Sequence, residues 1–281
     1  MADFVLDVQA EDLYQNISRV RNTCLLVWLL FLLPPTSYAQ QKELPLPGEV
    51  FTVSGATAFV ILPESIPANG NIPWVWYAPT LKGLPGPEEI WMFKQFLAAG
   101  VAIAGIDVGE SMGNAKGRKL YTALYEALAG KRHFKAQPVL LARSRGGLML
   151  YNWAVEHPLQ VGAIAGIYPV ADLRSYPGIE KAAIAYGWPV KKMTRKLAAN
   201  NPVSRMKPLA EARVPILHLH GDEDELVPLA NNSGAIAAAY KNYGADMTLL
   251  IQHGQGHNMW EGFFQSQALV DFVINQAMRQ H

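Results

Sequence analysis

The stretch PVLLARSRGG, residues 138–147, decides how this chain folds. It begins with an apolar run typical of a buried strand, and a helix-like segment over 148–156 follows it. Ser144 lies in the short turn between the two, with Ala142 two positions before it and Gly146 two positions after it. A strand and a helix that meet in so tight a turn leave room only for small residues there, and glycine is commoner than alanine before the serine. The pattern predicts a strand, a turn with the serine at its tip, and a helix.

Segments with strand and helix character alternate along the rest of the chain. Strands are expected over residues 50–53, 56–62, 74–77, 101–106, 138–141, 161–168, 216–220 and 247–251. Further helices are expected over residues 88–99, 117–129, 230–243 and 262–279. This alternation predicts an α/β fold with a mostly parallel sheet of about eight strands and helices on both faces. Because only a short link joins the first two strands, we expect them to form an antiparallel edge.

Residues 172–208 do not fit a simple crossover between two parallel strands. They are rich in Lys, Arg, Ala and Pro, and they follow the sixth expected strand. We interpret them as an insertion that forms a small lid over the site.

Composition limits the classes of protein that this chain can be. Of its 281 residues 50% are hydrophobic and 17% are charged, and the formal net charge is +1. This is enough apolar material for one large core and excludes a disordered protein. Since the 24 basic and 23 acidic residues are scattered along the chain, no nucleic-acid partner is expected.

The first 39 residues have the pattern of a secretory signal peptide. Basic residues precede a short apolar run over 24–33, and a small-x-small exit ends at Ala39. This pattern predicts cleavage after Ala39 and a secreted or periplasmic protein with no stable membrane association. The alternative is a membrane anchor, for which the run is short. Residues 40–48 then form a linker, and 49–281 form one domain.

Two further polar segments follow Ser144 in the chain. HGDEDELVP, residues 220–228, comes after an expected strand, and GQGHN, residues 254–258, comes after the last one. A serine hydroxyl becomes a nucleophile when a base takes its proton and a carboxylate orients that base. His257 is the candidate base. Asp224 and Asp222 are both candidates for the acid, with Asp222 more typical of a residue that stabilises a turn.

The turn, the acid loop and the histidine loop together resemble the α/β-hydrolases, in particular the prolyl oligopeptidase and dienelactone hydrolase branches. The resemblance extends from about Val50 to Arg279. It implies the chain order serine, acid, histidine, with the aspartate at position 224 orienting the histidine. It also implies an oxyanion hole with the backbone N–H of Arg145 as one donor. The second donor should follow the third strand, at Thr80 or Leu81.

Two arginines flank the serine, which is unusual. Arg143 and Arg145 could recognise an anionic substrate together with Glu110, or they could form a structural ion pair with that carboxylate. Trp260, which follows the histidine loop, could line an acyl pocket or belong to the core.

A zinc site is a competing interpretation of another segment. His218, His220 and Asp222 have the His-x-His-x-Asp spacing of some metal-dependent hydrolases, but Glu223 stands where the next histidine is needed. We therefore expect no metal and no cofactor.

These features predict an exported serine esterase that forms an acyl-enzyme on a small-molecule or carbohydrate ester. A serine peptidase of the prolyl oligopeptidase type is the first alternative, although the chain contains no propeller or other large accessory domain. A binding module that uses a hydrolase scaffold without catalysis is the second. The sequence indicates neither the preferred acyl group nor the oligomeric state.

Overall fold

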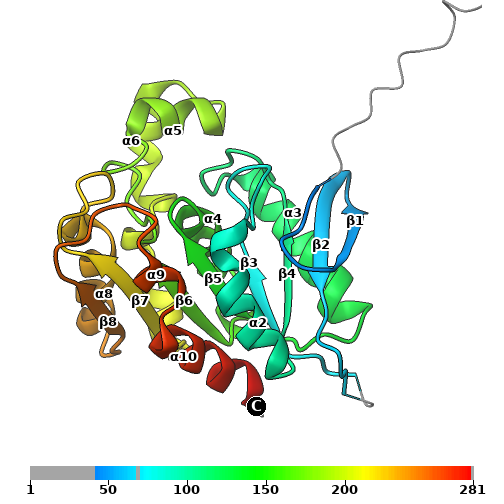
Figure 1. Cartoon of the computed structure of the whole chain (residues 1–281). Coiled ribbons are helices and arrows are strands. Elements are labelled where there is room, and N and C mark those ends of the chain that lie inside the picture. Colours follow the sequence, from blue (N-terminus) through cyan, green and yellow to red (C-terminus); the bar gives the residue numbers. More distant parts are fainter. Residues whose placement is uncertain (1–41, 68–69, 280–281) are drawn as a thin grey trace, which may run out of the picture. The chain divides into compact units, whose positions relative to one another are not determined.

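A computed structural model describes residues 42–67 and 70–279, and one eight-stranded sheet forms its centre (Figure 1). The strand order is β1-β2-β4-β3-β5-β6-β7-β8. The strands are Glu49–Val53 (β1), Ala56–Ile61 (β2), Trp74–Tyr77 (β3), Ala102–Ile106 (β4), Val139–Arg143 (β5), Ala163–Ile167 (β6), Ile216–Gly221 (β7) and Thr248–Gln252 (β8). β1 and β2 pair antiparallel, as β2 and β4 do, and every other pair is parallel. The expected α/β fold is confirmed.

Helices cover both faces of the sheet (Figure 1). The α-helices are Ile90–Ala98 (α2), Ala115–Tyr125 (α3), Gly146–Ala154 (α4), Ile179–Tyr186 (α5), Val190–Lys196 (α6), Lys207–Glu211 (α7), Ser233–Asn242 (α8), Glu261–Phe264 (α9) and Gln267–Met278 (α10). Helices α2 and α10 pack on one face, and α3, α4 and α8 pack on the other. The helix expected over 262–279 is interrupted, because Ser266 caps a new helix by accepting a hydrogen bond from the N–H of Leu269.

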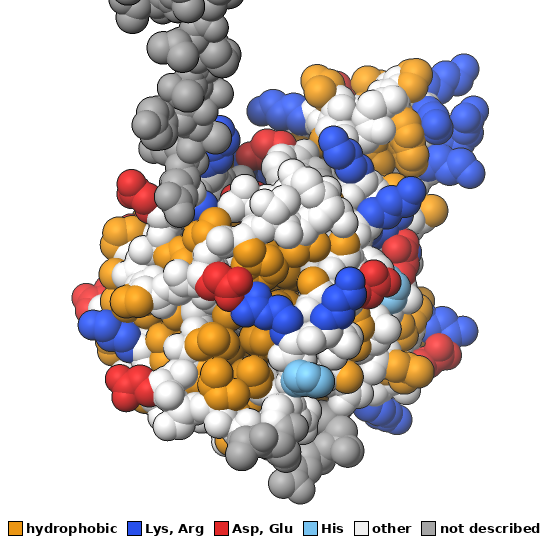
Figure 2. All heavy atoms as spheres, turned by 90° about the vertical axis from the view of Figure 1, so that its right-hand side faces the viewer, with side chains coloured by type: hydrophobic (Ala, Val, Ile, Leu, Met, Phe, Trp, Pro, Cys, Tyr) orange, Lys and Arg blue, Asp and Glu red, His pale blue; other side chains and the backbone are white. Residues whose placement is uncertain are grey.

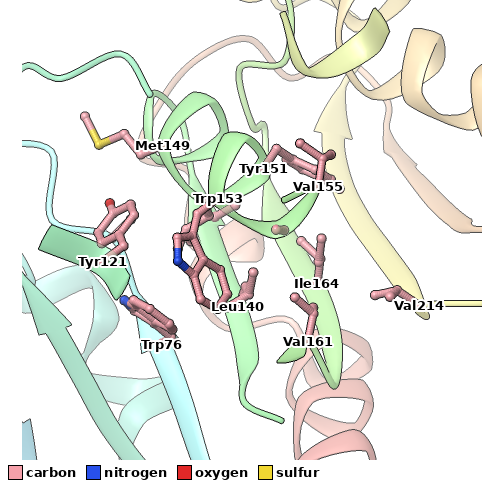
Figure 3. Close-up of a cluster of buried hydrophobic side chains, with 14 of the residues drawn as sticks. Trp76, Tyr121, Leu140, Met149, Tyr151, Trp153, Val155, Val161, Ile164 and Val214 are labelled. Atoms are coloured by element: carbon pink, nitrogen blue, oxygen red, sulfur yellow. The ribbon is translucent and has the colours of Figure 1, made fainter. Parts of the chain in front are cut away.

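Alternation along the strands divides the core into two layers. On β3, Trp74 and Trp76 face α3 and α4, whereas Val75 and Tyr77 face α2. Figure 3 shows the first layer, in which Trp76 lies beside Tyr121 and Trp153. The ring centroids of Trp76 and Trp153 are 4.8 Å apart. Burial of large aromatic side chains on both faces makes the sheet a rigid base for the loops at its carboxyl edge.

Helices α5 and α6 form a raised hairpin within the segment that was expected to be an insertion (Figure 1). Its inner side chains, Ala182, Ala183 and Met193, pack on Leu148 and Val227. Figure 2 shows Lys and Arg side chains gathered on this raised part. The Lys and Arg residues of α5 and α6 are Lys181, Lys191, Lys192, Arg195 and Lys196. Because its inner side chains pack on Leu148 and Val227, the hairpin adjoins the start of α4 and the acid loop.

The expected signal peptide, residues 1–39, lies outside the described residues. None of the helices in the described ranges is both long and apolar enough to cross a membrane.

Candidate active site

Ser144 lies at the tip of the turn between β5 and α4 with φ = 48°, an uncommon value for a residue other than glycine. Three backbone hydrogen bonds hold this conformation. The N–H of Ser144 donates to the carbonyl of Ile167 at 3.0 Å, and its own carbonyl accepts from the N–H groups of Gly147 and Val170 at 2.9 and 2.8 Å. The neighbouring strand and helix thus determine where the hydroxyl points.

The glycines after Ser144 are needed because the turn is crowded. A Cβ atom at Gly147 would lie 2.3 Å from the carbonyl oxygen of Val170, which is too close for any side chain. A Cβ atom at Gly146 would lie 3.2 Å from the Cβ of Ala78. The backbone of this turn therefore lies against the end of β3.

The imidazole of His257 connects Ser144 to Asp224. Nε2 of His257 lies 2.9 Å from Oγ of Ser144, and Nδ1 lies 2.8 Å from Oδ2 of Asp224. The carboxylate side chain is 0% exposed and the imidazole 15% exposed. The ring of Tyr168 packs on the imidazole with centroids 4.3 Å apart. This is the arrangement of a serine, a base and an orienting acid, in which the base can take the hydroxyl proton.

The acid loop and the histidine loop are joined by backbone hydrogen bonds. The N–H of Glu223 donates to the carbonyl of Gln255 at 3.0 Å, and the N–H of Asp222 donates to that of Gln252 at 3.3 Å. A Cβ atom at Gly221 would lie 1.9 Å from the carbonyl oxygen of Gln255. The adjacent parallel strands β7 and β8 thus bring the two loops into contact at one edge of the sheet.

The two candidate acids have different partners. Asp222 accepts hydrogen bonds from Nδ1 of His253 at 2.7 Å and from the N–H of Gly254 at 2.8 Å. It therefore fastens the exposed part of the histidine loop, whereas Asp224 contacts His257. Burial opposes ionisation of Asp224, but hydrogen bonds from His220, His257 and the N–H of Val227 hold its pKa well below the ordinary value. Asp224 is consequently a carboxylate at neutral pH.

The predicted oxyanion donors lie on neighbouring loops. Because β3 and β5 are parallel neighbours, the loop with Thr80 and Leu81 and the turn with Arg145 leave the sheet at the same edge. The side chain of Thr80 is 3.7 Å from where a Cβ of Gly146 would be. Thr80 and Leu81 also line a cavity of about 230 Å³, together with Glu110. The space beside Thr80 and Leu81 can thus take a small group, and Arg145 is not among the residues that line it.

The two arginines beside Ser144 have separate partners. Arg145 pairs with both carboxylate oxygens of Glu110, at 2.8 and 2.9 Å, as expected for a structural ion pair. The expectation that Arg143 shares Glu110 is wrong. Arg143 pairs instead with Glu89, whose side chain is 1% exposed.

The surroundings of Arg143 contain residues that sequence reasoning missed. Glu89 also accepts from the hydroxyl of Tyr77 at 3.0 Å and from the N–H of Gly86 at 2.8 Å. Nothing in the local sequence marks Glu89, which follows Pro87 at the start of a helical segment. Tyr168 could have been found as the residue directly after β6, at the edge where Ser144 lies. Trp260 is 41% exposed and packs edge-on against Phe263, so it is not a core residue.

His218 and His220 are fully buried and their ring nitrogens are occupied by hydrogen bonds to protein groups. Nδ1 of each lies within 2.9 Å of Oγ of Ser233, which is itself 0% exposed. Within residues 42–67 and 70–279, no group of three His, Cys, Asp or Glu residues is arranged to hold a metal ion. Because it is buried, Ser233 cannot reach a substrate.

Comparison with known proteins identifies one matching family. The sequence model of the prolyl oligopeptidase family, Peptidase_S9, matches residues 121–275, which is more than half of the chain. No curated protein matches the sequence.

Solved structures that resemble this chain include peptidases and an esterase. A puromycin-hydrolysing peptidase from Mycobacterium tuberculosis is 18% identical with a TM-score of 0.66, and the match covers 84% of this chain and 41% of that one. Dipeptidyl peptidase 4 from Porphyromonas gingivalis is 13% identical with a TM-score of 0.66, covering 82% and 35%. Est1E from Butyrivibrio proteoclasticus is 17% identical with a TM-score of 0.60, covering 83% and 100%. The chain thus spans less than half the length of these peptidases and all of Est1E, and the likeness supports the fold.

Proposed function

This chain belongs to the prolyl oligopeptidase family of serine hydrolases, and we propose that it hydrolyses carboxylic esters through Ser144, His257 and Asp224. The hydrogen-bonded series from Oγ of Ser144 through His257 to the buried Asp224 carries the proposal. A serine hydroxyl in contact with a carboxylate-oriented imidazole can attack an acyl carbonyl at neutral pH.

The reaction proceeds in two acyl transfers. Oγ of Ser144 attacks the ester carbonyl while Nε2 of His257 takes its proton, and Asp224 stabilises the resulting imidazolium. The N–H of Arg145 and the N–H of Thr80 or Leu81 bind the oxyanion. His257 then protonates the leaving alcohol, which leaves an acyl-enzyme. A water molecule, deprotonated by His257, attacks this ester, and collapse of the second tetrahedral intermediate releases the carboxylic acid and restores Ser144.

An ester is proposed ahead of a peptide because the solved structures that share this fold include an esterase, Est1E, beside the peptidases. The cavity of about 230 Å³ beside Thr80 and Leu81 suits a small acyl or alcohol group. A small-molecule or carbohydrate ester is therefore the proposed substrate class, with a peptidase as the second candidate, favoured by the family itself.

The raised hairpin of α5 and α6 is proposed as the lid. Its attachment supports this role, because Nδ2 of Asn114 donates to the carbonyl of Ala185 at 2.6 Å and the hydroxyl of Tyr186 donates to that of Met112 at 3.3 Å. The proposed place of action is outside the cytoplasm, on the strength of the signal-like residues 1–39. N-terminal sequencing of the secreted or periplasmic product tests this, since a mature chain that still begins before residue 39 contradicts it.

Two substrate classes and one covalent reagent distinguish the candidates. Turnover of p-nitrophenyl acetate or butyrate that disappears in Ser144→Ala supports the esterase. Cleavage of a prolyl peptide amide, with little turnover of esters, supports the peptidase. A chain that neither hydrolyses these compounds nor is labelled by a fluorophosphonate is a binding module.

A further inference from the structure

The polar contacts of Asp224 continue into the core from Oδ2, the oxygen that His257 also contacts. Nε2 of His220 lies 3.4 Å from Oδ2 of Asp224, and Nδ1 of His220 lies 2.7 Å from Oγ of Ser233. The same hydroxyl lies 2.9 Å from Nδ1 of His218, whose Nε2 lies 2.7 Å from the hydroxyl of Tyr151. All four side chains are 0% exposed. Three elements, α4, β7 and α8, contribute to this row.

The acceptors at one end determine the position of every proton. Nε2 of His220 also lies 2.8 Å from the carbonyl oxygen of Val227, so it faces two groups that can only accept, and it must carry the proton. Nδ1 of neutral His220 then accepts from Ser233, whose oxygen accepts from Nδ1–H of His218. Nε2 of His218 accepts from Tyr151. Each group donates in the direction of Asp224, and the last N–H, that of His220, bonds to the carbonyl of Val227 while lying 3.4 Å from the carboxylate. The proton positions have no alternative arrangement as long as both imidazoles are neutral.

We propose that Tyr151, His218, Ser233 and His220 form a positioning chain that orients Asp224 and sets the charge it presents to His257. The proposal rests on the proposed function of Ser144, His257 and Asp224. None of the four side chains touches the reacting atoms. They are positioning residues that act through Asp224.

Aligned dipoles explain the effect of the positioning chain. Every donor has its positive end directed toward the carboxylate, and hydrogen bonds aligned in this way strengthen one another. Burial, with a smaller contribution from His220, lowers the pKa of His218 to about 3, so this imidazole stays neutral at physiological pH. The N–H of Val227 donates to the other oxygen of Asp224 at 2.7 Å. Both oxygens are therefore held from the protein side, and His257 has a fixed partner.

Other ionisable groups near His257 are spread over several elements. Tyr168 packs on the imidazole, and beyond it lie Arg143 and Glu89. Asp222 and His253 form the exposed pair on the adjoining loops. Glu223 and Glu225 are the exposed acids of the acid loop itself. None of these groups changes in the variants below, so they provide a constant background.

The first test compares two replacements of His220. His220→Leu removes the donor, and Asp224 then presents more negative charge to His257. We expect the acid limb of the pH profile of kcat/KM for p-nitrophenyl butyrate to move upward by about half a pH unit. We expect kcat to fall about tenfold, as for loss of one hydrogen bond to a charged group, with little change in KM. His220→Gln retains an N–H donor, so its acid limb and its kcat should both lie close to those of the unmodified chain.

Variants further along the positioning chain test the same inference if His220→Leu does not fold. Ser233→Ala and then Tyr151→Phe should move the acid limb in the same direction by successively smaller amounts. Tyr240→Phe is the matched control. Its hydroxyl is equally buried, lies two turns from Ser233 on α8 and donates at 3.2 Å to the carbonyl of Val214, outside the positioning chain. It should lower the midpoint of thermal unfolding without moving the pH profile.

Two readouts separate this inference from the proposed function. The first is the rate of fluorophosphonate labelling of Ser144 against pH, which requires the nucleophile but no particular ester. The second is the proton NMR signal of Nδ1–H of His257, which requires no turnover. A wild-type chain that is never labelled contradicts the proposed function, and the NMR signal still tests the positioning chain. If the pH profile and the NMR signal of His220→Leu, or of Ser233→Ala where that variant alone folds, match those of Tyr240→Phe, the positioning chain is structural only and the inference is wrong.

Discussion

The guanidinium of Arg143, one residue before Ser144, forms an ion pair with the carboxylate of Glu89 beneath the candidate active site. The two side chains are 14% and 1% exposed. Burial opposes the charge on Arg143, but the carboxylate of Glu89 outweighs it and raises the pKa of the guanidinium. Its planar face also lies over the ring of Phe264, 4.9 Å from the centroid. Arg143 thus connects the end of β5 to Glu89, the residue directly before α2, and to Phe264 of α9.

Breaking this pair should cost much more stability than breaking the exposed one beside it. Glu89→Gln leaves a buried guanidinium without its counter-ion, so we expect the free energy of unfolding to fall by about 3–5 kcal/mol. Glu110→Gln, which breaks the pair with Arg145, is the control and should cost about 1 kcal/mol or less, because Glu110 is 49% exposed. Urea denaturation measures both, and equal losses would contradict the structural role of Glu89.

Ser144→Ala should lower the rate of ester hydrolysis at least about a thousandfold and leave the midpoint of thermal unfolding nearly unchanged. The hydroxyl contributes the nucleophile and one hydrogen bond, and alanine fits the same space. Ser233→Ala is the contrasting variant: it should lose stability, since buried His218 and His220 each lose a partner, but keep far more activity. Mass spectrometry after fluorophosphonate treatment should find the label at Ser144. A label at Ser233 would mean that the core opens to admit the reagent.

Asp224→Asn should lower kcat by roughly 10⁴-fold, because an amide cannot stabilise the imidazolium and favours the wrong tautomer of His257. Asp222→Asn should lower it much less, since Asp222 bonds to His253 and Gly254 on the exposed part of the loop. Steady-state kinetics on p-nitrophenyl butyrate at pH 8 compares the two. The reverse ranking would reassign the acid.

Stability should fall as the pH falls from 7 to 5, partly because of His218. The pKa of His218 in the folded state is lowered to about 3, whereas that of an unfolded histidine is near 6.5. Between these pH values the unfolded chain binds a proton at His218 and the folded chain does not. The stabilisation is complete above about pH 6.5 and is lost progressively toward pH 3. We expect His218 to account for about 2 kcal/mol of the loss between pH 7 and pH 5.

His218→Gln, which cannot take up that proton, tests this assignment. Urea denaturation at both pH values should show a smaller loss between pH 7 and pH 5 than in the unmodified chain. Tyr240→Phe, which loses a buried hydrogen bond but no group that titrates between pH 5 and pH 7, is the control and should keep the original slope. An unchanged slope in His218→Gln would contradict the assignment.

Local features of the sequence determined the fold and the places of the candidate residues. The small residues around Ser144, the alternation of strands and helices, and the order of serine, acid and histidine are short-range patterns. Each follows from sterics or from backbone hydrogen bonding within a few residues, so it could be recognised without coordinates. The pairing of Arg145 with Glu110 was also expected, because each follows a strand, β5 or β4, that ends at the same edge of the sheet.

Only the tertiary structure decided which side chains meet. The selection of Asp224 over Asp222 depends on how the acid loop crosses the histidine loop. The partner of Arg143 is Glu89, 54 positions away, rather than the expected Glu110. The contact of His220 with Ser233 depends on the packing of β7 against α8. Such contacts form between segments distant in the chain, and burial selects among several chemically equivalent partners that no local pattern distinguishes.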